Sequence, residues 1–143
     1  MTCDLCTLLG GDAPLVWSDE RLAVVLVDEP GYPGFARVIW RAHVREMTDL
    51  APADRDHVMQ AVWAVEQAQR SVMAPHKVNV ASFGNMTPHV HWHVIPRHTD
   101  DAHFPNPTWG AKQREADPAA IAARAALLPA LRAAINAQLA TLR

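Results

Sequence analysis

The sequence has few cysteines, no long apolar segment and no excess of basic residues, and each shortage excludes a class of protein. No apolar run approaches the roughly 18 residues that a membrane-spanning helix needs. The first residues, Met1 to Asp4, lack the basic and then apolar order of a signal peptide. We therefore expect a cytoplasmic protein that does not bind a membrane.

Basic residues are fewer than acidic ones, with 13 lysines and arginines against 15 aspartates and glutamates and a formal net charge of −2. A protein that binds a nucleic acid polymer neutralises many phosphates with basic side chains, so this balance argues against such a partner. A single nucleotide is compatible with it. The 143 residues, half of them apolar, suffice for one sizeable core, and we expect a single domain over residues 1–143.

The only two cysteines, Cys3 and Cys6, are separated by two residues. In a reducing compartment this spacing favours metal binding or redox chemistry over a structural disulfide. A thioredoxin-like pair is expected at a junction between a strand and a helix, which so early a position does not offer. A zinc site, which needs two further ligands, is therefore favoured over a redox pair or two free thiols.

Apolar patterning predicts strands over residues 15–17, 21–28, 35–40, 77–83 and 89–95. Pro52 suits the first turn of a helix, and valines at helical spacing continue the pattern until Pro75. A second helical segment begins at Asp117 and Pro118, and Pro129 either kinks it or begins another helix. This order predicts an α+β domain in which an antiparallel sheet accompanies a long central helix and a C-terminal helical segment.

Three histidines alternate with apolar residues in the segment His-Val-His-Trp-His-Val-Ile, residues 89–95. Side chains of a strand point to alternate faces, so His89, His91 and His93 are expected to share one face. Three imidazoles together can bind a metal, attack an electrophile, or hold and protonate a phosphate. A surface strand with incidental histidines is the less favoured interpretation, because such strict alternation is hard to reach without a purpose.

This motif, followed by Pro96 and Arg97, resembles the signature of the histidine triad (HIT) superfamily. The cysteine pair, the strand ending in Asp28, the strand leading to His43 and the central helix also follow the order of that family. The resemblance covers residues 3–98, and residues 99–143 form a C-terminal extension in which 103–110 are a candidate loop over the histidine face. It implies a HIT-like fold and a homodimer.

The resemblance also implies hydrolysis or transfer of a nucleotidyl group at its α-phosphate, with a purine nucleotide substrate and no organic cofactor. His91 would be the nucleophile and form a nucleotidyl-histidine intermediate. His93 would hold a phosphate oxygen or protonate the leaving group, and His89 would orient its neighbour or serve a metal. A nucleoside phosphoramidate and a dinucleoside polyphosphate are both candidate substrates.

Several further residues are candidate substrate contacts, of which Asp28 matches an acidic position of the resembling proteins and the others lie near the histidine strand or beside Asp28. Asp28 would accept hydrogen bonds from the ribose hydroxyls, although a plain turn residue is an equal alternative. Asn79, Asn85 and Thr87 are candidate contacts to phosphate or sugar, with Asn85 equally plausible as a turn residue. Leu26 is a candidate wall of the base pocket, for which ordinary core packing is the stronger alternative.

For the metal, the resemblance supplies the two missing ligands. Some members of the superfamily use the positions of His43 and His89, which with Cys3 and Cys6 would form a closed, structural zinc site.

One departure from the family pattern concerns Phe35, which follows Pro33 and Gly34 where many members carry a histidine. Any substrate contact that this histidine makes is absent here. The departure supports an alternative function, that of a nucleotide-binding regulatory protein with little turnover. A catalytic zinc site built on the histidine strand itself is a further alternative.

Overall fold

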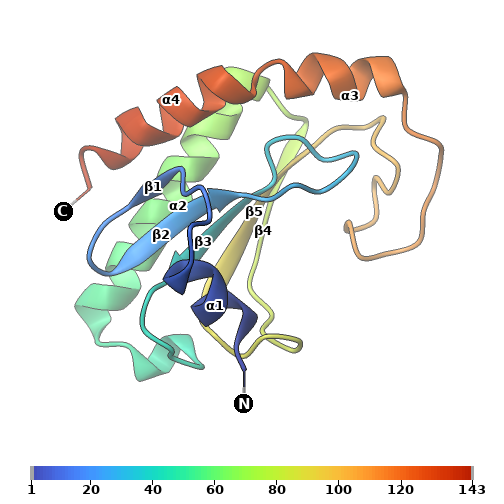
Figure 1. Ribbon diagram of the computed structural model, residues 1–143. Coiled ribbons are helices and arrows are strands. Elements are labelled where there is room, and N and C mark those ends of the chain that lie inside the picture. Colours follow the sequence, from blue (N-terminus) through green and yellow to red (C-terminus); the bar gives the residue numbers. More distant parts are fainter. Residues whose placement is uncertain (1, 143) are drawn as a thin grey trace.

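The computed structural model describes residues 2–142, with a five-stranded antiparallel sheet at its centre in the order β1-β2-β3-β5-β4 (Figure 1). The predicted α+β class with an antiparallel sheet is confirmed. The strands are β1 (Trp17–Ser18), β2 (Leu22–Leu26), β3 (Ala36–Trp40), β4 (Lys77–Ala81) and β5 (His91–Arg97).

The described residues also form four α-helices: α1 (Asp4–Gly10), α2 (Pro52–Met73), α3 (Pro118–Ala125) and α4 (Leu128–Leu139). A 3-10 turn, η1 (Met47–Asp49), precedes α2. The long central helix starts at Pro52 as predicted and ends at Met73, followed by the C-cap residue Ala74, whose φ of 46° lies in the left-handed region. Pro129 lies in the first turn of a separate helix, and α3 and α4 meet at 44°. Helix α1 is an addition to the predicted elements.

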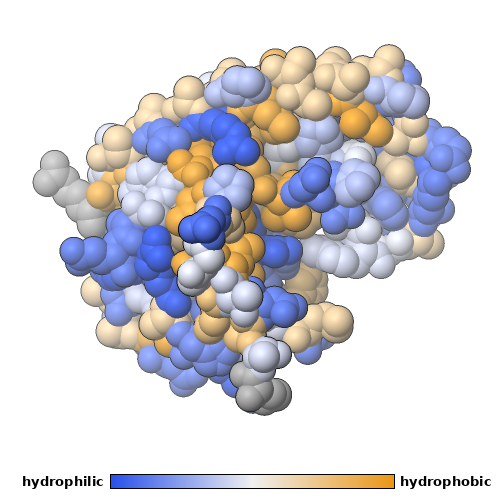
Figure 2. Space-filling view, in the orientation of Figure 1, coloured by the Kyte–Doolittle hydropathy of each residue, from blue (hydrophilic) through white to orange (hydrophobic). Residues whose placement is uncertain are grey.

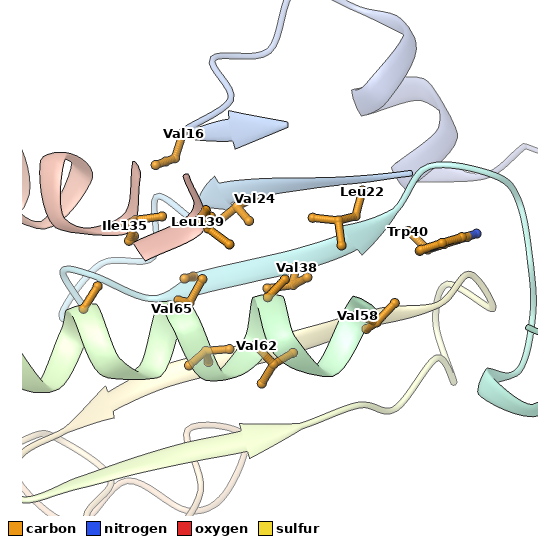
Figure 3. Packing of buried hydrophobic residues seen from close by; sticks show 14 of the residues in the cluster. Val16, Leu22, Val24, Val38, Trp40, Val58, Val62, Val65, Ile135 and Leu139 are labelled. Atoms are coloured by element: carbon orange, nitrogen blue, oxygen red, sulfur yellow. The ribbon is translucent and has the colours of Figure 1, made fainter. Parts of the chain in front are cut away.

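The core lies between the sheet and two helices. Figure 3 shows Val58, Val62 and Val65 of α2 beneath the valines of β2 and β3, with Ile135 and Leu139 of α4 beside them. All five of these helical side chains are at most 1% exposed. Burial of this apolar surface holds α2 and α4 against one face of the sheet, and α1 packs on the opposite face.

Gln69 of α2 is a buried polar residue that connects the helix to the sheet. Its Nε2 donates hydrogen bonds to the carbonyl oxygens of Val94 at 2.8 Å and Gly34 at 2.9 Å. Gly34 has a φ of +89°, and a Cβ at that position would lie 2.5 Å from the Sδ atom of Met73. The turn before β3 therefore requires glycine at this point, because both the backbone and the space exclude a side chain.

Several predicted strand boundaries are wrong, among them the end of the fourth strand, which lies at Ala81 rather than Phe83. The second strand ends at Leu26 rather than Asp28, and the first begins at Trp17 rather than Leu15. The turn between them is tight because Asp19 Oδ1 accepts hydrogen bonds from the N–H groups of Arg21 at 2.7 Å and Leu22 at 2.8 Å.

The histidine strand also begins later than predicted, at His91 rather than His89. The His89 N–H bonds to the Thr87 carbonyl at 2.8 Å, and the Val90 N–H bonds to the carbonyl of Val44. His89 therefore lies outside the ladders that β5 forms with β3 and β4.

Within residues 2–142 no single helix is long and apolar enough to cross a membrane, and only the bent pair of α3 and α4 reaches the required length and composition together.

Candidate active site and metal cluster

A cleft of about 680 Å³ opens on the sheet face opposite α2. Figure 1 shows α1 on this face, and Figure 2 shows apolar residues gathered in its middle with hydrophilic residues around them. Both His91 and His93 line the cleft, whereas His89 does not. The other lining residues come from α1, β3 and two loops: Asp4, Leu5, Arg37, Phe83, Gly84, Asn85, Met86, Thr87, Pro107, Trp109 and Gly110.

The ring of His91 is oriented by the backbone. Its Nδ1 lies 2.6 Å from the carbonyl oxygen of His89, and a carbonyl only accepts, so Nδ1 carries the proton. The lone pair is then on Nε2. Burial lowers the pKa of His91 against the opposing effect of this hydrogen bond, and the charge of Arg37 lowers it further. The imidazole is therefore neutral at pH 7, which is the nucleophilic form.

His93 is enclosed by three aromatic rings. The ring centroids of Phe35, Phe83 and Trp109 lie 5.7, 6.3 and 5.2 Å from its own. Burial and then the positive charge of Arg37 lower the pKa of His93 to about 4. A neutral ring at pH 7 suits a hydrogen bond to a phosphate oxygen better than the storage of a proton for the leaving group.

The segment after β5 folds over the cleft and brings Pro107, Trp109 and Gly110 to its wall, as the sequence predicted for residues 103–110. A buried ion pair holds this segment. Arg97 donates to Asp101 from Nε at 2.7 Å and from Nη2 at 2.9 Å, and also to the carbonyl of Asn106 at 2.7 Å. Loop and sheet are thereby connected through one guanidinium, which positions Trp109 against His93.

Asp101 is the centre of this network. Besides Arg97, its carboxylate accepts from the Tyr32 hydroxyl at 3.2 Å and from the N–H groups of His103 at 3.0 Å and Phe104 at 2.8 Å. Burial alone would raise the pKa of Asp101, but the hydrogen bonds from Arg97 and the backbone outweigh it and lower that pKa to about 2. The carboxylate is therefore ionised throughout the physiological range.

Of the five predicted substrate contacts, two line the cleft and three do not. Asn85 and Thr87 line the cleft. Asn79 instead accepts a 2.7 Å hydrogen bond from Arg97, and Leu26 packs against the main core, so neither lies on the cleft wall. Asp28 is exposed two residues beyond the end of β2, also outside the lining.

The predicted metal ligands Cys3, Cys6, His43 and His89 form the cluster of four side chains within the described residues that is suited to a metal ion. Their ligand atoms all lie within 4.8 Å of one another. Of the three motif histidines, only His89 contributes to it.

The geometry of this cluster fits zinc. Nδ1 of His89 lies 3.4 Å from Cys3 Sγ and 3.5 Å from Cys6 Sγ, and Nδ1 of His43 lies 3.4 Å from Cys6 Sγ. Zinc bonds to sulfur and nitrogen of about 2.3 and 2.0 Å at tetrahedral angles place S and N ligands about 3.5 Å apart. The His89 Nε2 faces the carbonyl of Trp40, which fixes the tautomer and leaves Nδ1 to bind the metal.

The cluster also anchors a wall of the cleft. Cys3 caps α1, with its Sγ accepting from the Cys6 N–H, and Leu5 of the same helix packs on Val25 and Ile39 of the sheet. Asp4 and Leu5 then line the cleft. Cys6 lies in α1, and no strand precedes this helix in the described residues, so the cysteine pair does not lie at a junction between a strand and a helix.

Arg37 is a cleft residue that the sequence analysis missed. It lies on β3, opposite His93 on β5. One signal was present in the sequence, because a lone charge stands in the middle of the apolar segment 35–40. Phe83 of the cleft wall carried no comparable signal, since it extended an ordinary strand pattern.

Comparisons with solved structures give closely similar folds. A histidine triad protein from Bradyrhizobium japonicum is 28% identical, with 85% of this chain and 90% of that chain covered and a TM-score of 0.70. A histidine triad protein from Marinobacter aquaeolei VT8 is 22% identical over the full length of both chains, with a TM-score of 0.71. A zinc-bound histidine triad family protein from Mycobacterium smegmatis is 25% identical, with 99% and 98% covered and a TM-score of 0.65.

No protein with a curated description matches the sequence. The sequence model of the HIT domain matches residues 11–100, which include β1 to β5, α2 and the three motif histidines. Because this match spans more than half of the sequence and the solved neighbours share the fold over most of its length, the chain belongs to the histidine triad (HIT) family.

Proposed function

We propose that this protein hydrolyses or transfers nucleotidyl groups, with His91 as the nucleophile toward the α-phosphate of a nucleoside phosphoramidate or dinucleoside polyphosphate. One observation carries the proposal: His91 lines the cleft while its Nδ1 donates to the His89 carbonyl, so that a neutral ring presents its Nε2 lone pair. A purine nucleotide fits the volume and the aromatic lining of the cleft.

In the first step, Nε2 of His91 attacks the α-phosphorus, and the bond from phosphorus to the leaving group breaks. The leaving group departs with the electron pair and takes up a proton from solvent. The ring becomes cationic because Nδ1 keeps its proton, and the His89 carbonyl stabilises that charge. Water then attacks the phosphorus, the P–N bond breaks, and the nucleoside monophosphate leaves with release of one proton.

The remaining side chains of the cleft hold the phosphate. His93 donates a hydrogen bond to a non-bridging oxygen, and Asn85 and Thr87 offer further donors from the loop before β5. Trp109, whose indole ring contacts both His93 and Phe83, excludes water from the leaving-group side.

Turnover of an adenosine phosphoramidate and of a diadenosine polyphosphate by purified protein tests the proposal. His91→Ala should abolish both activities and still bind adenosine monophosphate. His93→Ala should slow them by about 10²- to 10³-fold, the loss expected when one donor to a developing oxyanion is removed. His76→Ala, a surface histidine outside the cleft, is the matched control and should retain full activity. Wild-type rates in His91→Ala, or a trapped nucleotidyl group on another residue, would contradict this mechanism.

A nucleotide-binding regulator with little turnover is the second candidate. Phe35 supports it, because this buried ring, 5% exposed, packs edge-on against His93 where many members carry a histidine. The same assay separates the two functions. Tight binding of adenosine monophosphate without turnover of either substrate would favour the regulator.

We further propose that Cys3, Cys6, His43 and His89 bind one structural zinc ion. The four ligands leave no open position for a substrate, so the ion would hold α1 to the sheet rather than take part in the reaction. The zinc-bound neighbour from M. smegmatis supports this assignment.

A homodimer is the proposed assembly. Strand β4 forms one edge of the sheet, and Val80 on it is 39% exposed. Trp63 on α2 is 59% exposed. Two sheets joined edge to edge along β4, with α2 near the two-fold axis, would cover both apolar surfaces.

A further inference from the structure

Arg37 brings a permanent positive charge into the cleft. Its Cα is paired with that of His93 on β5 and that of Val25 on β2, in the middle of the sheet. The guanidinium lines the cleft together with His91 and His93. Among the described lining residues it is the only lysine or arginine, and Asp4 is the only carboxylate.

Within residues 2–142 this guanidinium has no hydrogen-bond or ion-pair partner. Its Nε is buried without a hydrogen bond, and no carboxylate of residues 2–142 forms an ion pair with it. Glu29 acts on it only at longer range. A half-buried cation without a partner is costly, and native structures usually pair such a group with an anion.

Arg97 on the neighbouring strand is buried, but its guanidinium is fully paired. Arg97 is 2% exposed and donates to Asp101, Asn79 and the carbonyl of Asn106. The fold therefore supplies partners to the arginine that is structural. Arg37, in contrast, is left unpaired in the cleft, where an anionic ligand would bind.

We propose that Arg37 is the phosphate-binding cation of this cleft, and that it selects nucleotides over uncharged nucleosides. The inference rests on the proposed function for the identity of the ligand as a nucleotide. A guanidinium presents parallel N–H donors that match two oxygens of one phosphate. Its position opposite His93 places this charge on the strand beside the two histidines.

Titration calorimetry with adenosine monophosphate and adenosine tests the inference. Arg37→Met keeps an apolar stem of similar shape and removes the guanidinium charge. It should weaken binding of the monophosphate by about 10- to 100-fold, the range expected for a lost charge-assisted hydrogen bond, and leave adenosine binding unchanged. Arg37→Lys should fall between wild type and Arg37→Met. Arg45→Met, an arginine whose side chain is 75% exposed, is the matched control and should bind like wild type.

Equal losses for both ligands would overturn the inference, since they would assign Arg37 to the base or to the fold, and so would an unchanged preference for the monophosphate. If Arg37→Met fails to fold, the Nε–Hε NMR signal of Arg37 in the wild-type protein decides. It should shift with adenosine monophosphate and not with adenosine.

The two proposals fail in distinguishable ways. If the wild-type protein turns over no adenylated substrate and Arg37→Met still loses the preference for the monophosphate, the proposed reaction is refuted and the anion site is retained. Active wild-type protein with an unaffected Arg37→Met would do the reverse.

Discussion

The backbone carbonyl oxygen of His89 accepts the hydrogen bond from Nδ1 of His91 at 2.6 Å, while the ring of the same His89 faces the thiols of Cys3 and Cys6. A single residue thus connects the metal cluster to the proposed nucleophile. The cluster positions the ring of His89 and therefore also its backbone carbonyl. A change in the cluster would shift this carbonyl and alter its hydrogen bond to Nδ1 of His91.

Replacing Cys6 with serine should lower both metal content and stability. Wild-type protein purified without added metal should carry about one zinc per chain, because four ligands form a closed site. Cys6→Ser should lose most of this zinc, measured by mass spectrometry of metals, and melt at a lower temperature, because zinc binding contributes to folding. Thr7→Ser, the next residue on α1, should retain both. Full zinc occupancy in Cys6→Ser would rule out this ligand set.

Replacing Asp101 with asparagine should destabilise the fold and the loop that carries Trp109. The change leaves the buried Arg97 guanidinium, 2% exposed, without its counter-charge, and breaking such a pair costs roughly 3–5 kcal/mol. Urea unfolding measures this loss. Asp100→Asn removes a more exposed pair with Arg124 and should cost no more than about 1 kcal/mol. Similar losses in the two variants would mean that the Arg97 pair does not organise the loop.

The lowered pKa of Asp101 should also make the stability of the fold depend on pH. Its pKa falls from an ordinary value of 3.8 to about 2 in the folded protein, so the folded state holds the ionised form more strongly. The corresponding stability is present above about pH 4 and is lost as the pH falls toward 2, because the unfolded chain binds its proton first. Melting temperatures between pH 2 and pH 5 should therefore fall more steeply in wild type than in Asp101→Asn. Parallel curves would contradict the assignment.

A charge on α2 should disrupt the proposed dimer. Light scattering on wild-type protein should report twice the chain mass of 15.7 kDa, and Trp63→Glu should shift it toward one chain by placing an unpaired carboxylate in an apolar contact. Glu20→Arg lies in the exposed turn between β1 and β2, at the opposite edge of the sheet, and should not alter the mass. A wild-type mass of one chain at micromolar concentration would argue against dimerisation.

We expect Asp28 to bind the ribose hydroxyls of the nucleotide. Asp28→Ala should weaken binding of adenosine monophosphate roughly 10-fold, the lower end for a lost hydrogen bond to a charged group. It should have little effect on the 2′,3′-dideoxy analogue, which has no hydroxyls to donate. The neighbouring Glu29→Ala is the control. Because Asp28 is exposed outside the cleft lining, an unchanged affinity would assign it to the turn after β2.

Local patterning was sufficient for much of the fold. Alternation predicted the strands around Val38 and Val94, and helical spacing predicted α2, because side-chain direction repeats every two residues in a strand and every 3.6 in a helix. The same patterns missed α1. That helix is only seven residues long, too short for a clear period, and it forms against Val25 and Ile39 of distant strands.

The different positions of the three histidines could not be predicted from local patterning. Alternation placed them together on one face, yet His89 lies outside β5 and turns toward Cys3, Cys6 and His43, more than 40 residues away in sequence. A strand pattern assumes that the ladder continues. Whether it does depends on backbone partners such as Val44, which the pattern does not contain.

The sequence by itself determined the chemistry available to this protein: three imidazoles at strand spacing, two thiols, and one charge within an apolar strand. Only the tertiary structure decided how these groups are combined, which nitrogen of His91 is free, and which of two arginines is paired. The physical reason is that tautomers, pKa values and ion pairs depend on burial and on neighbours a few ångströms away in space. Those neighbours come from strands and loops that the fold brings together and the sequence leaves apart.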